Sequence, residues 1–384
     1  MRPGRRFVPW LATLLVVLLA AASCAEAELD APEAGDGDDG EVAEPEPDPE
    51  PEPELHVVAK VAPIADLVAM VGGARVEVAT LVPSGADSHT YEPRPSDVAR
   101  LSDAAAFIGV GLELNPGAVS LAEENLPAES IVLLGERYLD DDALVFDHVH
   151  DEDGGHTHGE DGGHTHDDGG GHTHGDDDGG HSHDDEGEGH SHGHDEDGDG
   201  PGPNPHVWTG LPLAADLVDG IADALGDLDP EGAQEYRERA GEARTEIEAL
   251  HDRVAQATAT IPEDNRTLIV YHDAWSYFAR DYGLEMVTAV QPSDYAEPSA
   301  GDVREIIDLV EEHDVPALFG SEVFPSDVLD TIGEETGATY VGDLADDTLP
   351  GEPGHPEHTY LELMRRNAQL IVEHLGGDVS VLRG

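Results

Sequence analysis

The sequence predicts an α/β protein in which two similar lobes, each a parallel sheet flanked by helices, are joined by one long helix. Short apolar runs alternate with helical patterns in two separate segments, 55–146 and 203–384. A long unbroken helical pattern lies inside the second segment. The 384 residues also suit two domains. Hydrophobic residues make up 38%, which is expected where folded lobes share the chain with long polar tracts.

The first lobe, 55–146, shows the alternation that is typical of parallel strands with crossover helices. Its strands are expected at 56–62, 76–82, 106–110 and 131–134, and its helices at 63–71, 96–103 and 116–125. Residues 203–228 complete this lobe with a helix at 212–226. Asp229 and Pro230 then open the linking helix, expected within 229–260. At about 1.5 Å per residue it spans on the order of 45 Å, enough to bridge two lobes.

The second lobe, 261–384, repeats this architecture. Its strands are expected at 267–271, 286–290, 317–320 and 339–342, and its helices at 274–282, 301–313, 326–336 and 360–375. In both lobes each expected strand is followed by a helix, so the carboxyl ends of the strands meet at one edge of each sheet.

Residues 1–24 are typical of a targeting segment. Arg2, Arg5 and Arg6 precede an apolar run, 7–22, which is shorter than the ~20 residues of a membrane span. A positive start, a short apolar run and small residues form a secretory signal. The end of the run, A-A-S-C, resembles a bacterial lipobox, so Cys24 is expected to carry lipid and anchor the mature chain to a membrane. An ordinary secretory signal without lipid is the alternative.

Two polar tracts interrupt the folded segments. Residues 25–54 are rich in proline and acidic side chains, which repel one another and favour an extended tether. Residues 147–202 contain 13 histidines, 19 acidic residues and no lysine or arginine, and repeat the pattern G-H-[TS]-H. Paired imidazoles beside carboxylates suit zinc, copper or nickel. The candidate accessory ligands are His148, His150, His156, His158, His164, His166, His172, His174, His181, His183, His190, His192 and His194. A solvated acidic linker whose histidines bind nothing is the alternative.

The charge balance and the cysteine count exclude several functions. Eighteen Lys and Arg against 85 Asp and Glu give a net charge of −67, so the chain cannot neutralise the phosphates of a nucleic acid. Cys24 is the only cysteine, which excludes an internal disulfide and any cluster of thiolate ligands. A metal ion would therefore be held by histidine and carboxylate.

Four such side chains are expected near strand ends. His89 follows the strand at 76–82, His272 follows the strand at 267–271, and Asp343 follows the strand at 339–342. His206 lies just before a helix, where the chain returns to the fold. Ligands of open α/β sheets bind beyond the carboxyl ends of the strands. Three imidazoles and one carboxylate can complete a tetrahedral zinc shell.

Four long motifs carry a family resemblance over nearly all of both lobes. They are L-V-P-S-G-A-D-S-H-T-Y-E-P-R-P-S-D within 57–97, N-P-H-V-W at 204–208, Y-H-D-A-W-S-Y-F-A-R-D-Y-G-L at 271–284 and Y-L-E-L-M-R-R-N at 360–367. The chain thereby resembles the zinc-type solute-binding lipoproteins of ABC metal importers (cluster A-I). The resemblance implies a rigid linking helix and a metal site in the cleft between the lobes. It also implies a histidine-rich loop before the second ligand, where this chain has its tract.

The resemblance also implies a ligand set. His89, His206 and His272 match the family's three histidines, and Asp343 is implied as the fourth ligand. This chain reads G-D-L-A-D around Asp343, where the family has a Leu-Asp-Pro type of segment. Manganese-type members carry a carboxylate at the position of His272, so this histidine favours zinc. Protonation of ordinary imidazoles near pH ~6 is expected to weaken binding.

The function expected from these features is that of a non-catalytic zinc receptor outside the cytoplasm. As a monomer, anchored through Cys24 to the outer face of the membrane or free in a periplasm, it would pass Zn²⁺ to an ABC permease driven by a cytoplasmic ATPase. The histidine-rich tract would collect or buffer zinc. Two alternatives remain: a zinc store or adhesin without a permease, and a zinc hydrolase, since three-histidine sites can activate water.

Overall fold

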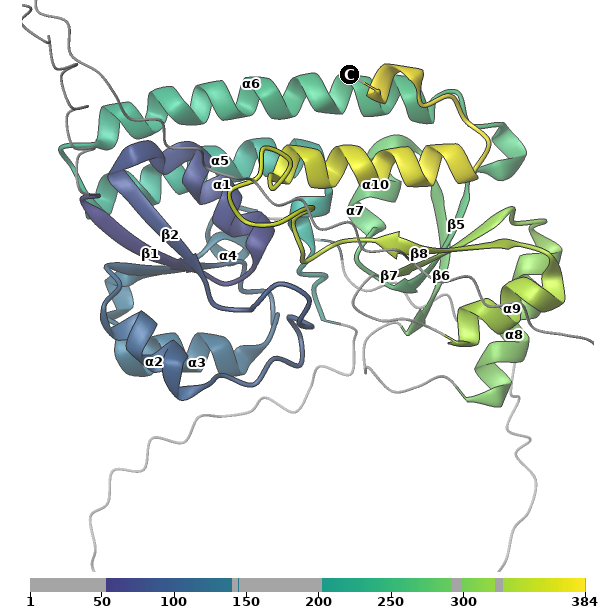
Figure 1. Cartoon of the computed structure of the whole chain (residues 1–384), viewed down its shortest axis with the longest axis horizontal. Helices are drawn as coiled ribbons and strands as arrows, with labels where there is room; N and C mark the ends of the chain where they lie inside the picture. Colours follow the sequence, from purple (N-terminus) through teal and green to yellow (C-terminus); the bar gives the residue numbers. More distant parts are fainter. Residues whose placement is uncertain (1–52, 140–143, 145–201, 292–298, 322–326, 384) are drawn as a thin grey trace, which may run out of the picture. The chain divides into compact units, whose positions relative to one another are not determined.

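The computed structural model describes residues 53–139, 144, 202–291, 299–321 and 327–383, and these form two sheets with their helices (Figure 1). The first sheet has the strand order β2-β1-β3-β4, and all its neighbouring strands are parallel. Its elements are β1 (Leu55–Ala59), α1 (Ala62–Gly72), β2 (Val76–Thr80), α2 (Pro95–Ser102), β3 (Ala106–Gly109), α3 (Pro116–Asn125), β4 (Ile131–Leu133), α4 (Leu134–Tyr138) and α5 (Leu211–Leu228). The short helix α4 is an element that the sequence did not predict.

The second sheet repeats this pattern with the order β6-β5-β7-β8, again parallel throughout. Its elements are β5 (Thr267–His272), α7 (Ser276–Tyr282), β6 (Glu285–Gln291), α8 (Ala300–Glu312), β7 (Ala317–Ser321), α9 (Asp327–Thr336), β8 (Thr339–Leu344) and α10 (Tyr360–His374). The predicted fold class, two α/β lobes with parallel sheets, is therefore confirmed.

The helices form because their apolar residues recur at helical spacing. In α1 the buried residues Ile64, Leu67, Val68 and Val71 lie at i, i+3, i+4 and i+7, which places them on one face. Helix α8 begins at a capping box, in which Ser299 accepts from backbone N–H groups and Asp302 accepts from the Ser299 N–H. Each lobe thus buries one stripe of each helix against its sheet.

Helix α6 (Ala233–Thr258) connects the two lobes. Its 26 residues span about 39 Å at ~1.5 Å per residue. It packs against α1 and α5 of the first lobe and against α10 of the second (Figure 1). Residues from both lobes and from α6 belong to one continuous hydrophobic core. This shared core fixes the spacing of the two sheets, and with it the loops between them.

Helix α6 begins later than the sequence predicted. Asp229 accepts hydrogen bonds from Arg75 and from the Tyr236 hydroxyl, and Gly232 N–H donates to its carbonyl oxygen. These contacts close a turn before the first helical residue. Among the described residues, none of the helices has both the length and the apolar character needed to cross a membrane.

Candidate metal centre

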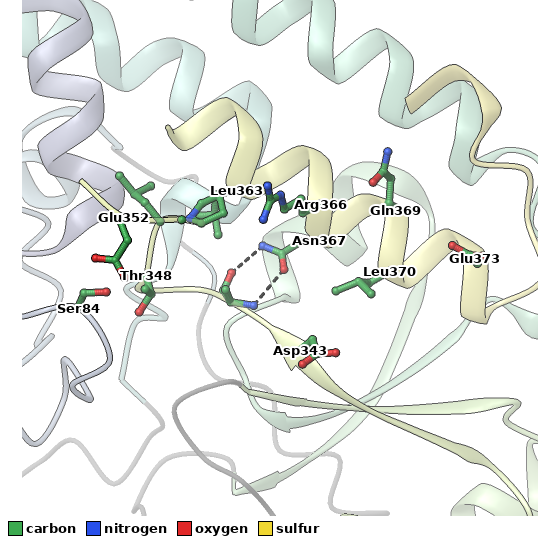
Figure 2. A pocket seen from close by; sticks show the side chains of 14 residues that line it. Ser84, Asp343, Thr348, Glu352, Leu363, Arg366, Asn367, Gln369, Leu370 and Glu373 are labelled. Carbon is green, nitrogen blue, oxygen red and sulfur yellow. Dashed lines mark hydrogen bonds between the residues drawn. The ribbon is translucent and has the colours of Figure 1, made fainter. Parts of the chain in front are cut away.

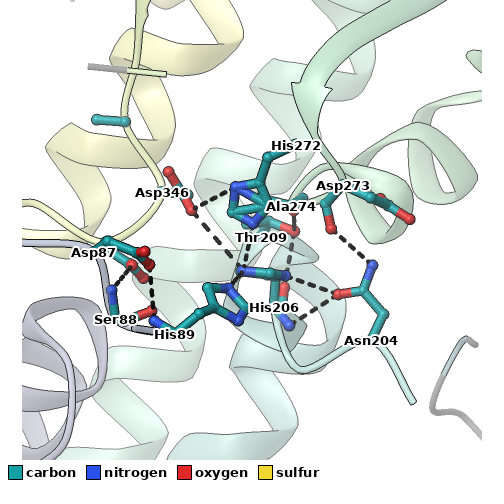
Figure 3. A network of polar contacts seen from close by, with 12 residues as sticks. Asp87, Ser88, His89, Asn204, His206, Thr209, His272, Asp273, Ala274 and Asp346 are labelled. Atoms are coloured by element: carbon teal, nitrogen blue, oxygen red, sulfur yellow. Dashed lines mark hydrogen bonds and ion pairs between the residues drawn. The ribbon is translucent and has the colours of Figure 1, made fainter. Parts of the chain in front are cut away.

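Three imidazole rings from separate segments meet between the lobes (Figure 3). His89 lies in the loop after β2, His206 directly precedes the short 3₁₀ helix Val207–Thr209, and His272 ends β5. His206 Nε2 lies 2.9 Å from His89 Nε2 and 3.0 Å from His272 Nε2. A tetrahedral Zn²⁺ with bonds of about 2.0–2.1 Å would hold its nitrogen ligands about 3.3 Å apart. The three rings therefore need to separate by only a few tenths of an ångström to accept such an ion.

Asn204 fixes which nitrogen of His206 faces this point. The Asn204 amide nitrogen donates to the Asp273 carbonyl oxygen (3.0 Å), so its Oδ1 must face the other way. That Oδ1 lies 2.9 Å from His206 Nδ1 and also accepts the His206 backbone N–H. Nδ1 of His206 therefore carries the proton, and its Nε2 presents a lone pair. One lone pair cannot accept from both neighbouring imidazoles, whereas a cation between the three nitrogen atoms could accept a lone pair from each.

Burial keeps all three imidazoles neutral. His206 and His272 are almost completely buried, and burial lowers the pKa of both. Burial, with help from His272 and Lys60, lowers the pKa of His89 to about 2. Neutral imidazole is the form that binds metal. The loss of binding that ordinary imidazoles would show near pH 6 is therefore expected only at lower pH.

The metal-free protein is expected to lose stability as the pH falls from about 6.5 to 5. Unfolded histidine takes up a proton near pH ~6.5, whereas the three folded imidazoles do not, so acid favours the unfolded chain. Burial also raises the pKa of Asp66, Asp273 and Asp347, which acts in the opposite direction, so the histidine contribution is measured by comparing the parent with a variant that lacks one imidazole. Urea unfolding at several pH values measures the slope. A His89→Asn variant should show a shallower slope, and an identical slope would contradict this assignment.

The structure corrects the expected fourth ligand. Asp343 is still part of β8, its side chain is exposed, and it lines a surface pocket of about 600 Å³ together with Asn367 and Leu370 (Figure 2). It is not brought to the three histidines. The carboxylate that reaches them is Asp346, whose Oδ2 lies 3.9 Å from His206 Nε2 and 3.8 Å from His272 Nδ1 (Figure 3).

Contacts from both lobes hold the segment that carries Asp346. Trp208 Nε1 donates to the Asp346 carbonyl oxygen (2.8 Å). The Asn367 side chain on α10 pairs with the backbone N–H and C=O of Ala345, as the dashed lines in Figure 2 show. Tyr360 in turn donates to the Trp208 carbonyl oxygen. These contacts fix the backbone that carries the Asp346 carboxylate.

Asn115 holds the loop that carries His89 through hydrogen bonds to the loop backbone. This residue adopts a left-handed backbone conformation (φ 47°), which asparagine tolerates better than most residues. Its amide nitrogen donates to the carbonyl oxygens of Ser88 (3.1 Å) and Tyr91 (2.8 Å). Lys60, the only lysine in the chain and completely buried, donates to the Asn115 carbonyl oxygen. Burial lowers the pKa of Lys60 to about 7.

A second carboxylate, Asp347, closes the site from the other lobe. Its Oδ2 accepts the Ser88 N–H (3.3 Å). Its Oδ1 and the Ser88 hydroxyl are buried and have no hydrogen-bond partner among the described residues. Buried polar atoms are normally satisfied, so these two atoms fit a bound water molecule or a cation.

Several residues of this site were not predicted from the sequence. Asp346 and Asp347 form an acidic pair directly after a strand, a signal that could have found them. Asn204 stands two residues before His206, where it was read only as part of a motif. Lys60 gave no signal, because a lone lysine is normally exposed. Cys24 and the thirteen tract histidines, from His148 to His194, lie outside the described residues.

Comparison with known proteins agrees with this geometry. Residues 57–374 match the family model of the periplasmic zinc-uptake complex component A. The high-affinity zinc uptake system protein ZnuA of Paracoccus denitrificans is 36% identical over 337 residues, covering 84% of this chain and 92% of that protein. The manganese-binding lipoprotein MntA of Halalkalibacterium halodurans is 24% identical over 362 residues, covering 94% and 96%.

The fold has a solved counterpart in the periplasmic zinc-binding protein TroA of Treponema pallidum. That structure aligns with a TM-score of 0.65 at 22% identity and covers 84% of this chain and 99% of TroA. Two parallel sheets, a connecting helix and a histidine cluster at their strand ends thus accompany the match of the family model. The chain belongs to the ZnuA family, the periplasmic metal-binding component of zinc-uptake complexes.

Proposed function

We propose that this protein captures Zn²⁺ outside the cytoplasm and delivers it to an ABC permease driven by a cytoplasmic ATPase. The ion is the cargo, held by His89, His206 and His272, with Asp346 as the fourth ligand in place of Asp343. The matching family model is that of one component of a zinc-uptake complex, which supports the presence of membrane partners. The protein would act as a monomer, because one chain supplies all four ligands.

The convergence of three imidazole nitrogen atoms on one buried point supports this proposal most strongly. Two of the Nε2–Nε2 distances are 2.9 and 3.0 Å, and burial keeps the imidazoles neutral. Asn204 aims the His206 lone pair at the same point. Three neutral nitrogen ligands and one carboxylate are a donor set that zinc prefers, whereas manganese favours oxygen-rich sites.

The relatives leave the metal open, because their names include both zinc and manganese. His272 is the residue that argues for zinc here, since a nitrogen donor makes the site softer. Copper and nickel would also bind a three-histidine site. Selectivity against these two ions would rest on geometry and on metal supply.

A competitive titration is expected to show stronger binding of Zn²⁺ than of Mn²⁺. The assay uses the full-length chain with the thirteen tract histidines replaced by asparagine, so that one site remains. A His272→Glu variant should lower the ratio of the Zn²⁺ affinity to the Mn²⁺ affinity by at least about tenfold, because a carboxylate oxygen replaces an imidazole nitrogen. The matched control is His355→Ala, because His355 is exposed and is not one of the three clustered histidines. Tighter binding of Mn²⁺ by the parent would overturn the assignment.

We also propose that the histidine-rich tract collects or buffers zinc. Its thirteen histidines would add bound ions in the same titration when the natural tract is compared with its asparagine version. Equal stoichiometry would contradict this role.

Cys24 is proposed to carry the lipid anchor, which the lipoprotein name of the MntA relative supports. Loss of lipid incorporation in a Cys24→Ser variant would test it.

The hydrolase alternative has little support. The cavity beside His272 and Asp346 has a volume of about 10 Å³, which leaves room for about one water molecule. The family consists of transport receptors. A zinc store or adhesin would bind metal in the same way, and zinc-limited growth of a strain that lacks the permease would separate it from a receptor.

A further inference from the structure

We propose that Tyr277 is a positioning residue for the metal centre: its hydroxyl holds Asn204 in place, and through Asn204 it sets the orientation of His206. The inference rests on the proposed function of the three histidines as metal ligands. Tyr277 lies on α7, five residues after His272, and its side chain is completely buried. It does not itself contact the point where the histidines meet.

The hydroxyl of Tyr277 makes two hydrogen bonds. It donates to the Asn204 carbonyl oxygen (2.7 Å) and accepts the Leu144 backbone N–H (3.0 Å). Asn204 N–H donates to the Leu144 carbonyl oxygen (2.7 Å). Burial raises the pKa of Tyr277 to about 12, so the hydroxyl keeps its proton near neutral pH. The three residues therefore form a closed cluster, which we call the Tyr277 clasp.

The clasp lies where the histidine-rich tract joins the fold. Leu144 precedes the tract and Asn204 follows it, and the clasp binds them to each other and to the second lobe. Asn204 is also the residue whose Oδ1 holds the His206 ring through Nδ1–H. By holding the Asn204 backbone, the clasp also holds the side chain that orients the His206 ring.

A change at Asn204 should therefore alter the metal centre even though Asn204 is not a ligand. Partners that orient a metal-bound histidine typically change metal affinity by about 10–100-fold. Tyr277→Phe removes the hydroxyl but keeps the ring that fills the core. The matched control is Tyr282→Phe on the same helix. The Tyr282 hydroxyl bonds His251 Nδ1 (3.0 Å) on α6, a residue outside the clasp.

The test uses the full-length chain with the thirteen tract histidines changed to asparagine, titrated with Zn²⁺ against a chelator and with Co²⁺ for its absorption spectrum. Tyr277→Phe is expected to weaken Zn²⁺ binding about tenfold and to change the Co²⁺ spectrum, whereas Tyr282→Phe should stay within about twofold of the parent. Unchanged affinity and spectrum in Tyr277→Phe, with only a lower thermal midpoint, would overturn the proposal.

A double-variant cycle tests whether Tyr277 acts through Asn204. Asn204→Ala removes the acceptor of the His206 Nδ1–H and should reproduce the change in the Co²⁺ spectrum. If Tyr277 acts only through Asn204, the variant that combines Tyr277→Phe with Asn204→Ala should bind Zn²⁺ no more weakly than Asn204→Ala alone. Additive losses would reject the path. A parent that binds no Zn²⁺ would instead contradict the proposed function, which separates the two failures.

Discussion

His206→Ala is expected to lower the affinity for Zn²⁺ by about 100- to 1,000-fold. Zinc sites with four protein ligands have apparent binding free energies of about 10–16 kcal/mol, or roughly 2.5–4 kcal/mol for each ligand, and each 1.4 kcal/mol is tenfold. His206 is central to the proposed site, because its Nε2 lies near both other imidazoles. Zn²⁺ titration against a chelator, on the chain with the asparagine version of the tract, measures the loss.

Two controls separate this loss from a folding defect. His355→Ala removes an exposed imidazole and should leave the affinity unchanged. His206→Gln retains a polar side chain at the buried position, so a folded His206→Gln protein that still fails to bind attributes the loss to the imidazole. If His206→Ala folded and bound zinc like the parent, the three-histidine site would have to be abandoned.

Asp346→Asn is expected to weaken Zn²⁺ binding by roughly 30- to 150-fold, whereas Asp343→Asn is expected to change it little. Interactions with a charged partner contribute about 2–3 kcal/mol, which gives that range. Asp346 has an oxygen within 4 Å of two ligand histidines, while Asp343 is exposed on β8. The change from Asp to Asn preserves shape and removes only the charge. The same chelator titration measures both variants.

The pair of variants decides between two carboxylates three residues apart. Trp208 and Asn367 hold the backbone around Asp346, so its amide analogue should stay in place. A thermal unfolding midpoint close to that of the parent would confirm this. Should Asp343→Asn prove the more damaging change, the ligand implied by the family resemblance would be restored.

The positions of the three histidines could be predicted because each depends on a local pattern. His272 ends an apolar run that could only be a buried strand, and His89 follows another. The two strands belong to different sheets, so strand order places each of these histidines only at the carboxyl edge of its own sheet. That the two edges meet across a cleft, with His206 beside them, was implied by the family resemblance.

Asp346, the carboxylate nearest the histidines, could not be predicted because its place in the loop depends on where β8 ends. The strand expected at 339–342 extends through Leu344, so Asp343 remains in the strand and its side chain faces outward. This two-residue extension makes Ala345 the first residue of the loop and Asp346 the first carboxylate in it. A register shift between Phe319 and Ser321, where β7 pairs with β8, accompanies this extension. Such irregularities arise from packing rather than from local sequence.

The supporting residues could not be predicted because their partners are distant in the chain. Tyr277 and Asn204 are separated by 73 residues, and Lys60 and Asn115 by 55. No periodicity or composition links such pairs. Only the folded arrangement shows that the Tyr277 hydroxyl contacts the segment that leads into His206.

The burial of Lys60 makes the folded protein nearly inert toward amine-reactive chemistry. It is the only lysine, and its side chain has no exposed surface. A reagent that acylates primary amines would therefore find, apart from the chain's own terminus, a target only when the first lobe opens. The rate at which Lys60 is labelled would then measure that opening directly, without any engineered probe. Lys60, which bonds the residue that holds the His89 loop, would thus report how often the first lobe opens.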